Sequence, residues 1–473
     1  MSQENLQQNR TTRFLKAIGL YAIGNLGSKL ITFLMVPLYT YYVNASDYGF
    51  YDICLTLIFF AIPFMTLQMR DGAFRFLVDA DDDKRRSIVI TFAYRVMFVS
   101  SIVAIVVGGC VEMFASVQYL WLAVLLLIVM SFYEVVVQIT RGIGNTVSFV
   151  GAGIISSLGI GVFSVVFVVL LDMGIEGVFI ANILARVVAL GYIEIKDCII
   201  RRYLVAKPDY GTIRKEILKY TLPLIPGLVF WWIIGSTDRL FIEHYLGLSA
   251  NGLYAVAFRL VSVLQVLATI FYQAWQETAL RQYESADRDK FFSDMFNNYL
   301  YVLLCVSIVF VFSLRMCYGW LVSAEFSTSA QYLYPMAVSL VLFALVAFMD
   351  MGYQCAKDTK RTLPAIILAA VINLVLNFVM IRYIGLWGVV TTSIVTYLVL
   401  LVYRIYDMRR YFKLRLYKRS MIPVVLLLVG FVLYCATTSM VIDIIMVAFV
   451  SLVFIFFMPE EIKAMLMSKI RRT

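Results

Sequence analysis

Charge and histidine are scarce in this sequence. Charged residues make up only 15% of the 473 positions, and His244 is the one histidine. A soluble domain carries charge at roughly a quarter of its positions. Hydrophobic residues instead account for 62% of the chain. This balance excludes an ordinary soluble fold, and it indicates an all-helical membrane protein that uses lipid as its solvent.

Sequence motifs for nucleotide or metal chemistry are also missing. There is no Walker motif and no GxGxxG that follows a strand and opens a helix. Asp238 and Glu243 lie near His244, but one histidine without a second cluster is a poor zinc site. The sequence therefore predicts no cofactor, no metal and no enzymatic activity.

Cysteine pairs with the spacing of a metal or redox site are absent as well. The seven cysteines are scattered, without a CxxC pair: Cys54, Cys110, Cys198, Cys305, Cys317, Cys355 and Cys435. Most fall inside apolar runs, where a thiol packs as a small hydrophobic group. Neither a disulfide framework nor a zinc site is expected.

A cleavable signal peptide is not expected either. Arg10, Arg13 and Lys16 precede an apolar run that reaches about Val43, which is too long for a signal sequence. A spanning helix needs about 20 apolar residues, and we expect about fourteen such helices in the chain. Their approximate ranges are 15–37, 49–69, 88–109, 118–138, 148–171, 177–197, 218–238, 252–275, 295–314, 331–353, 363–383, 387–407, 421–438 and 441–458.

Lys and Arg are nearly absent from every second connecting segment. If the N-terminus is cytoplasmic, the inside segments hold 31 of these cations, whereas the outside segments hold Arg239, Arg315 and Arg382. Basic loops stay in the cytoplasm during insertion. The pattern predicts an even number of helices with both termini cytoplasmic, and it accounts for most of the +10 net charge.

The sequence contains two weak internal repeats. A shift of 203 residues places Ser46 on Ser249 and residues 48–51 on 251–254. Residues 174–178 resemble 385–389 in the same way. The repeats predict two six-helix halves of the same orientation, 1–206 and 207–412, followed by two further helices and a cytoplasmic tail in 413–473. A substrate path between such halves is typical of repeat transporters.

Four cations fall deep in the expected helices: Lys29, Arg95, Arg186 and Arg259. Lys29 follows Asn25 in a polar stretch that suggests an inward face. A cation at the bilayer centre costs roughly 2.5–3.5 kcal/mol, so these residues should have a partner or a function. A cavity with an excess of Lys and Arg attracts anions such as phosphate. We expect Lys29, Arg186, Arg259, Asn25 and Arg95 to bind the substrate.

Structural explanations remain open for several of these residues. Arg95 and Glu134 lie at similar depth and could neutralise each other, and Arg186 could bind backbone carbonyls of its own bundle. Lys196 and Arg404 lie near cytoplasmic helix ends and can extend to the membrane interface. The remaining charges are expected to couple to an ion or to form a gate: Glu134, Asp238, Arg239 and Asp350.

Amides and prolines inside the helices are further candidates. The amides Gln68, Gln138, Gln265, Gln273, Asn373 and Asn377 can bind sugar hydroxyls or join neighbouring helices. Pro223 and Pro226 are expected to bend the helix at 218–238.

Several stretches together resemble the polysaccharide transporter branch of the multidrug/oligosaccharidyl-lipid/polysaccharide exporter superfamily. They are residues 25–29, 47–49, 221–226, 237–242, 251–257 and 385–388. The resemblance covers nearly the whole chain, and 221–257 is its most specific part. It implies two six-helix lobes in a V, plus the two C-terminal helices, and alternating access. The implied cargo is an undecaprenyl-diphosphate-linked oligosaccharide, such as a capsule or O-antigen unit, moved to the outer leaflet of a bacterial inner membrane.

The resemblance also implies where such a cargo would bind. The diphosphate would lie near Lys29, Arg186 or Arg259, and the polyprenyl tail would stay in the lipid. H⁺ or Na⁺ is the expected coupling ion, and glycan polymerases are possible partners.

Three other functions compete with this interpretation. A multidrug antiporter for organic cations should present carboxylates in its cavity, which Lys29 argues against. The two extra helices are also found in lipid II flippases, so a peptidoglycan precursor is an alternative cargo. A glycan polymerase or ligase would need a large outer loop with catalytic residues, whereas residues 315–330 carry only Arg315 and Glu325 as charges.

Overall fold

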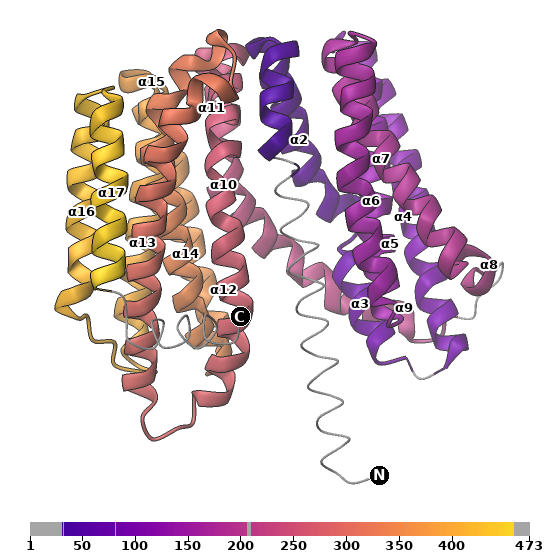
Figure 1. Cartoon of the computed structure of the whole chain (residues 1–473). Helices are drawn as coiled ribbons and strands as arrows, with labels where there is room; N and C mark the ends of the chain where they lie inside the picture. The colour runs from indigo at the N-terminus through magenta and orange to yellow at the C-terminus, as the bar shows by residue number, and fades with distance from the viewer. Residues whose placement is uncertain (1–30, 32, 81, 206–209, 357, 458–473) are drawn as a thin grey trace, which may run out of the picture. The chain divides into compact units, whose positions relative to one another are not determined.

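The computed structural model describes residues 31, 33–80, 82–205, 210–356 and 358–457 (Figure 1). These residues are helical almost throughout, and the part described contains no strand. Ten of its helices are long and apolar enough to cross a membrane, or eleven if the bent pair α11–α12 is one span. The predicted all-helical membrane protein is confirmed. The expected helix at 15–37 lies mostly outside the described residues.

The chain divides into two compact units, Met1–Trp232 and Ile233–Thr473. The first unit contains α2 (Ala45–Met65), α3 (Met69–Val78), α4 (Asp83–Phe114), α5 (Leu120–Gly142), α6 (Thr146–Ser164), the π-helix η1 (Val165–Leu170), α7 (Gly174–Asp197), α8 (Ile199–Tyr203), α9 (Ile213–Thr221) and the 3₁₀ turn η2 (Leu222–Leu224). Helix α10 (Ile225–Leu246) runs from the first unit into the second.

The second unit continues with α11 (Leu248–Val261), α12 (Val263–Gln282), α13 (Arg288–Leu321), the 3₁₀ helix η3 (Ala324–Tyr332), α14 (Leu333–Cys355), the 3₁₀ turn η4 (Thr359–Arg361), α15 (Thr362–Met408), α16 (Lys418–Ala436) and α17 (Met440–Phe456). Helix α15 contains both helices expected at 363–383 and 387–407. Non-helical backbone at Ile384 and Gly385 separates its two halves.

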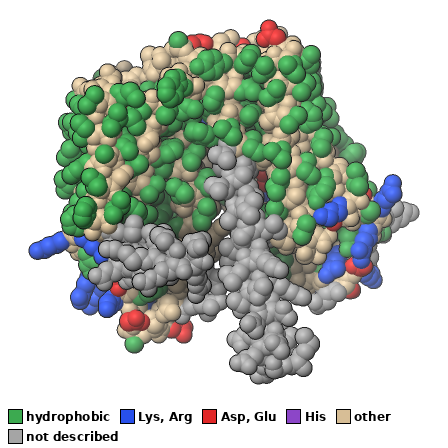
Figure 2. Space-filling model, in the orientation of Figure 1, with side chains coloured by type: hydrophobic (Ala, Val, Ile, Leu, Met, Phe, Trp, Pro, Cys, Tyr) green, Lys and Arg blue, Asp and Glu red, His purple; other side chains and the backbone are tan. Residues whose placement is uncertain are grey.

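Hydrophobic side chains cover the visible face along most of the helix length (Figure 2). Lys and Arg side chains gather at one end of the helices in each unit (Figure 2). This separation is what a bilayer requires, because hydrocarbon favours apolar side chains and the interface favours charge.

One helix boundary differs from the sequence prediction. The helix expected at 49–69 ends at Met65, and Leu67 and Gln68 take left-handed φ angles of 46° and 55°. Such angles interrupt a helix made of L-residues. A new helix, α3, then carries Arg70 and Arg75, which were expected in a loop. The proline stretch was predicted more accurately, since the 3₁₀ turn η2 around Pro223 interrupts the helix there.

Both sequence repeats have counterparts in the backbone. Helices α2 and α11 begin at Ala45 and Leu248, which are 203 residues apart. Gly174 and Gly385 share left-handed φ angles of 53° and 56°, which glycine adopts without steric cost. Each of these glycines is followed three residues later by a second glycine. A Cβ on Gly177 would clash with the backbone of Phe167, and a Cβ on Gly388 would clash with the backbone of Met380.

This close approach predicts a stability effect in α7. A Cβ at Gly177 would lie 2.9 Å from the Phe167 carbonyl oxygen, so Gly177→Ala should destabilise the protein by about 1–3 kcal/mol through overpacking. Gly191 lies in the same helix with nothing within 4 Å of its ideal Cβ. Gly191→Ala should therefore leave stability unchanged or raise it by up to about 1 kcal/mol. Thermal unfolding in detergent compares the two variants, and equal melting temperatures would contradict this packing.

The two C-terminal helices are anchored to the second unit by a buried arginine. Arg315 of α13 was expected in an outside segment, but α13 continues to Leu321 and the Arg315 side chain is only 10% exposed. Its guanidinium pairs with Asp443 in the first turn of α17. It also donates to the carbonyls of Tyr434 and Thr437 at the end of α16, at 2.8 and 2.9 Å. The Arg315 side chain thus gives hydrogen bonds to carbonyls at the end of α16 that lack a partner within the helix, and its ion pair with Asp443 fixes the start of α17.

Candidate functional site

A buried carboxylate, Asp238, organises the polar core of the second unit. Asp238 lies on α10 and is 2% exposed. Its Oδ1 accepts a hydrogen bond from Asn377 Nδ2 at 2.7 Å. Its Oδ2 accepts from Tyr254 OH and Ser393 Oγ, both at 2.9 Å. These donors come from α11 and from both halves of α15, so the carboxylate joins three helices.

The network extends along α10 and α15. Asn377 Nδ2 also lies 3.1 Å from Asn373 Oδ1. Thr237 Oγ1 lies 3.3 Å from the same oxygen and 2.7 Å from the Ile233 carbonyl. We name Thr237, Asp238, Tyr254, Asn373, Asn377 and Ser393 the Asp238 cluster.

Several buried atoms on α15 lack hydrogen-bond partners among the described residues. They are Asn373 Nδ2, Asn377 Oδ1, Thr392 Oγ1 and Thr396 Oγ1. A buried polar atom without a partner costs roughly 1–3 kcal/mol. Three of the four are oxygens, which are the ligands that hard cations prefer. Of these oxygens, Asn377 Oδ1 belongs to a side chain that contacts Asp238, so it and the carboxylate are the candidate ligands of a small cation.

Arg239 follows Asp238 but has a different environment. Its guanidinium lies over the rings of Tyr254 and Phe258, at 5.5 and 4.8 Å from their centroids. Its Nη1 lies 3.4 Å from the Gly235 carbonyl. Arg239 is 8% exposed, so this predicted gate residue is buried beside the Asp238 cluster rather than in an outside segment.

Asp350, the next predicted coupling residue, forms a buried ion pair. Arg404 Nε lies 2.9 Å from Asp350 Oδ1, and the Arg404 side chain is fully buried. The contact is an ion pair and not a hydrogen bond, because Arg404 Nε and Asp350 Oδ1 are not aligned for one. Arg404 also lies over the Tyr353 ring at 4.8 Å. The expectation that Arg404 extends to the interface is wrong, because Asp350 on α14 holds it inside the unit.

Three predicted residues of the first unit have partners within that unit. Arg186 Nη1 donates to the carbonyl and to Oδ1 of Asn182, one turn earlier in α7. Glu134 pairs with Arg70 of α3 at 3.0 Å, rather than with Arg95. Arg95 is exposed and lies over the Tyr210 ring at 5.6 Å. Each of these arrangements gives the charge a structural partner in its own unit.

Arg259 lies in the last turn of α11 and is half-buried. Asn25 and Lys29 lie outside the described residues. The structure thus brings Asp238 together with Asn373 and Asn377, but it does not bring the predicted cations of the first unit into one cluster.

Tyr254 and Ser393 were not predicted from the sequence as partners of Asp238. Tyr254 could have been found, because it falls in the repeat segment 251–254 beside the family-like stretch 237–242. Ser393 had no comparable signal, since a serine in an apolar helix is common. Among the described residues, no group of three or more His, Cys, Asp or Glu could hold a metal ion.

A family model described as "Polysaccharide biosynthesis protein" matches residues 14–276. No curated protein sequence matches the chain significantly. The solved structure of the lipid II flippase MurJ in an inward closed conformation is similar, with a TM-score of 0.66 and 15% identity. That similarity covers 96% of this chain and 100% of the other.

Transporters of the MOP superfamily are also similar in structure. An inward-facing multidrug resistance MATE family transporter has a TM-score of 0.65 and 15% identity, over 82% of this chain and 98% of the other. A transporter from Pyrococcus furiosus, described by a reverse polarity of its binding pocket, has a TM-score of 0.56 and 14% identity. That similarity covers 84% of this chain and 96% of the Pyrococcus furiosus transporter. At these identities the similarities show the fold.

Proposed function

Because the chain belongs to the polysaccharide biosynthesis protein family, we propose that it is a flippase for a polyprenyl-diphosphate-linked oligosaccharide. The protein is a multi-pass membrane protein with the fold of MOP-superfamily transporters. In the proposed cycle, it exposes its site first to the cytoplasmic leaflet and then to the outer leaflet. The family match over more than half of the chain is the observation that carries this proposal.

The excess of deep cations supports an anionic cargo. Lys29 and Arg259 are the proposed ligands of the diphosphate, with Arg186, Arg95 and Asn25 as further contacts. Arg binds phosphate oxygens through its planar fork, and Lys binds them as a point charge. Arg186 already donates to Asn182, so its contribution is the weaker one. Lys29 and Arg259 are the residues to test first, because both fall deep in the expected helices and both are proposed ligands of the diphosphate.

The Asp238 cluster is the proposed coupling site. The chain has no nucleotide-binding motif, so the energy must come from an ion gradient or from the gradient of the substrate itself. A buried carboxylate that joins three helices responds to neutralisation, because a proton or Na⁺ changes which hydrogen bonds it accepts. We propose that H⁺ or Na⁺ binds at Asp238 and biases the conformation of the second unit.

The rival cargoes differ in charge and head group. An organic cation would meet Lys29 and Arg259 as like charges, which disfavours the multidrug antiporter. Lipid II carries a diphosphate and therefore remains the alternative cargo, and the MurJ fold covers 96% of this chain. A location in a bacterial inner membrane with cytoplasmic termini, and a glycan polymerase as partner, complete the proposal. The protein itself performs no covalent chemistry in this account.

Loss of one phosphate ligand should slow transport strongly. We expect Lys29→Ala and Arg259→Ala each to reduce leaflet exchange of a fluorescent undecaprenyl-diphosphate oligosaccharide in liposomes. A hydrogen bond to a charged group contributes about 1.5–3 kcal/mol, which corresponds to roughly 10- to 150-fold in rate.

Lys196→Ala is the matched control for this experiment. The Lys196 side chain is exposed and lies 3.1 Å from Tyr192 OH, so its loss should leave exchange unchanged. If both test variants fold and exchange lipid at the wild-type rate, the deep cations are structural and diphosphate binding at these residues is excluded.

A further inference from the structure

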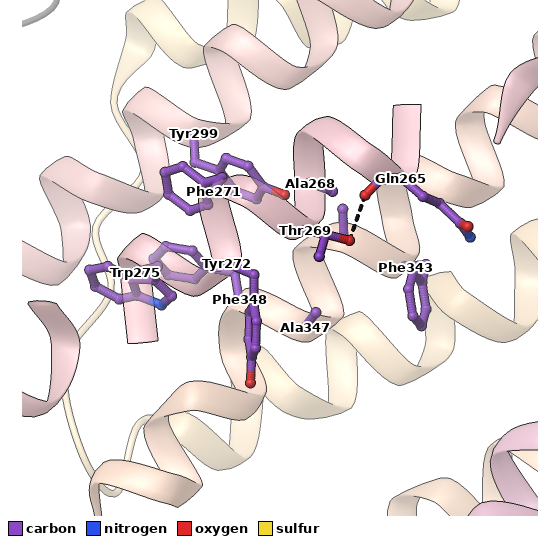
Figure 3. Close-up of a pocket in the computed structure, with 11 residues that line it drawn as sticks. Gln265, Ala268, Thr269, Phe271, Tyr272, Trp275, Tyr299, Phe343, Ala347 and Phe348 are labelled. Carbon is purple, nitrogen blue, oxygen red and sulfur yellow. Dashed lines mark hydrogen bonds between the residues drawn. The ribbon is translucent and has the colours of Figure 1, made fainter. Parts of the chain in front are cut away.

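The second unit contains an aromatic cavity of about 390 Å³ between α12, α13 and α14 (Figure 3). Six rings line it: Phe271, Tyr272, Trp275, Tyr299, Phe343 and Phe348. Its size lies within the range of roughly 300–1,000 Å³ that small-molecule sites occupy. All of these residues belong to one unit, so the cavity exists without any contribution from the other.

The aromatic walls of the cavity are preorganised by ring stacking. Phe271 stacks on Tyr299 with ring centroids 3.8 Å apart, and Trp275 stacks on Phe348 at 4.5 Å. Stacked rings restrict one another, so they form fixed flat surfaces. A ligand with a flat apolar face can lie against such a surface without reorganising it.

Polar groups interrupt the aromatic lining. Gln265 lines the cavity, and its carboxamide makes no hydrogen bond to the other described residues. Trp275 is 1% exposed, and its Nε1 has no hydrogen-bond partner in the part of the chain that the structure describes. Thr269 Oγ1 donates to the Gln265 carbonyl at 2.7 Å (Figure 3) and can still accept a bond. These groups favour a ligand that carries hydroxyls.

A carboxylate lies at one end of the same helix face. Phe343, Ala347, Asp350 and Gln354 follow one another at helical spacing in α14, which places them along one stripe. Gln354 Nε2 donates to Tyr272 OH at 2.9 Å, so the stripe and the cavity wall meet there. The Asp350 side chain is 20% exposed, and Arg404 approaches it from α15. Asp350 itself does not line the cavity and stays paired with Arg404, so the polar lining comes from α12.

We propose that this cavity binds one sugar ring of the transported glycan, an inference that rests on the proposed function. The apolar C–H face of a pyranose suits the negative face of an aromatic ring. Its hydroxyls can bond the side chains of Gln265 and Thr269, which line the cavity. An isoprenoid chain would fill the same space but would leave these polar groups without partners, which is costly in a dry site. In this proposal the cavity of the second unit binds a sugar of the glycan, while Lys29 and Arg259 bind the diphosphate.

Protection of a cysteine placed in the cavity tests this proposal. Ala347→Cys is reconstituted in liposomes, and the rate of labelling by a small methanethiosulfonate is read at residue 347 by mass spectrometry. The probes are undecaprenyl diphosphates that carry one to four sugars and undecaprenyl diphosphate without sugar. When a glycolipid exceeds its Kd about tenfold, labelling should slow about tenfold, because only the empty site reacts. The sugarless lipid should give no protection.

Two other results would overturn the sugar site, and a third would contradict the proposed function. Equal protection by the sugarless lipid would assign the cavity to the isoprenoid chain. No protection by any glycolipid that the protein demonstrably exchanges between leaflets would show that the cavity is not visited. Failure to exchange any of these lipids would instead contradict the proposed function, so the two failures are distinguishable.

A second variant separates binding from packing. Gln265→Leu preserves volume and removes the carboxamide, so the KM for glycolipid exchange should rise several-fold while thermal stability is retained. Gln282→Leu is the same substitution at the exposed end of α12, and it should leave the KM unchanged. Equal KM values for the two variants would also overturn the sugar site.

Discussion

Asp238→Asn should remove the response of transport to an ion gradient. The amide is nearly isosteric with the carboxylate, so it fits between Tyr254, Asn377 and Ser393, but it can neither bind a proton nor neutralise Na⁺. Coupling between two sites is typically worth about 5- to 150-fold, and we expect the variant to lose that stimulation entirely. The measurement is the initial rate of glycolipid exchange in liposomes with and without an imposed Na⁺ or proton gradient.

The control for Asp238→Asn is Glu112→Gln, which also removes one carboxylate charge. Glu112 lies at the exposed end of α4, so its loss should preserve the response. The gradient that stimulates the wild type identifies the ion. Stimulation of Asp238→Asn to the wild-type extent would show that the Asp238 cluster is structural, and coupling would have to occur elsewhere.

Arg315→Leu should cause the largest loss of stability. It leaves the Asp443 carboxylate, which is 3% exposed, buried without its charge partner, and it frees the Tyr434 and Thr437 carbonyls. Breaking a buried ion pair from one side costs about 3–5 kcal/mol. The free energy of unfolding, measured in detergent by denaturant titration, should fall by this amount.

The double variant Arg315→Leu with Asp443→Leu separates charge burial from packing. Without the stranded carboxylate, the double variant should be more stable than Arg315→Leu alone, because an apolar pair often replaces a buried ion pair at little cost. Purely additive losses would mean that the two residues do not interact, and α16 and α17 would then be held by other contacts such as the 2.7 Å bond from Tyr301 OH to the Val453 carbonyl.

Hydrophobic runs were enough to predict the helices of this chain. Each expected segment from 49–69 onward coincides with one or more helices, because about 20 apolar residues in lipid leave few alternatives to a helix. The boundary at Met65 was missed, since the left-handed φ angles at Leu67 and Gln68 have no glycine to signal them. Arg315 was placed in a loop because its position in the sequence does not reveal that Asp443, 128 residues later, neutralises it.

Partners distant in sequence explain the other errors at the candidate site. Arg404 appeared free to reach the interface because Asp350 lies 54 residues earlier. Glu134 was matched to Arg95 by depth alone, whereas α3, which was not expected as a helix, brings Arg70 to it. Asp238 was recognised as a candidate from its position, but the donors around it come from α11 and both halves of α15. Depth in the membrane can be read from a single sequence, whereas the neighbour across a helix pair cannot.

The central claim is that the cargo is a diphosphate-linked glycan, and its most direct test is leaflet exchange by the wild-type protein. Liposomes that contain the protein and a fluorescent undecaprenyl-diphosphate oligosaccharide are compared with protein-free liposomes, with and without an excess of a lipophilic organic cation. We predict that the protein accelerates exchange of the glycolipid and that the organic cation neither competes nor is exported. Export of the cation without exchange of any glycolipid would contradict the account and identify a multidrug antiporter.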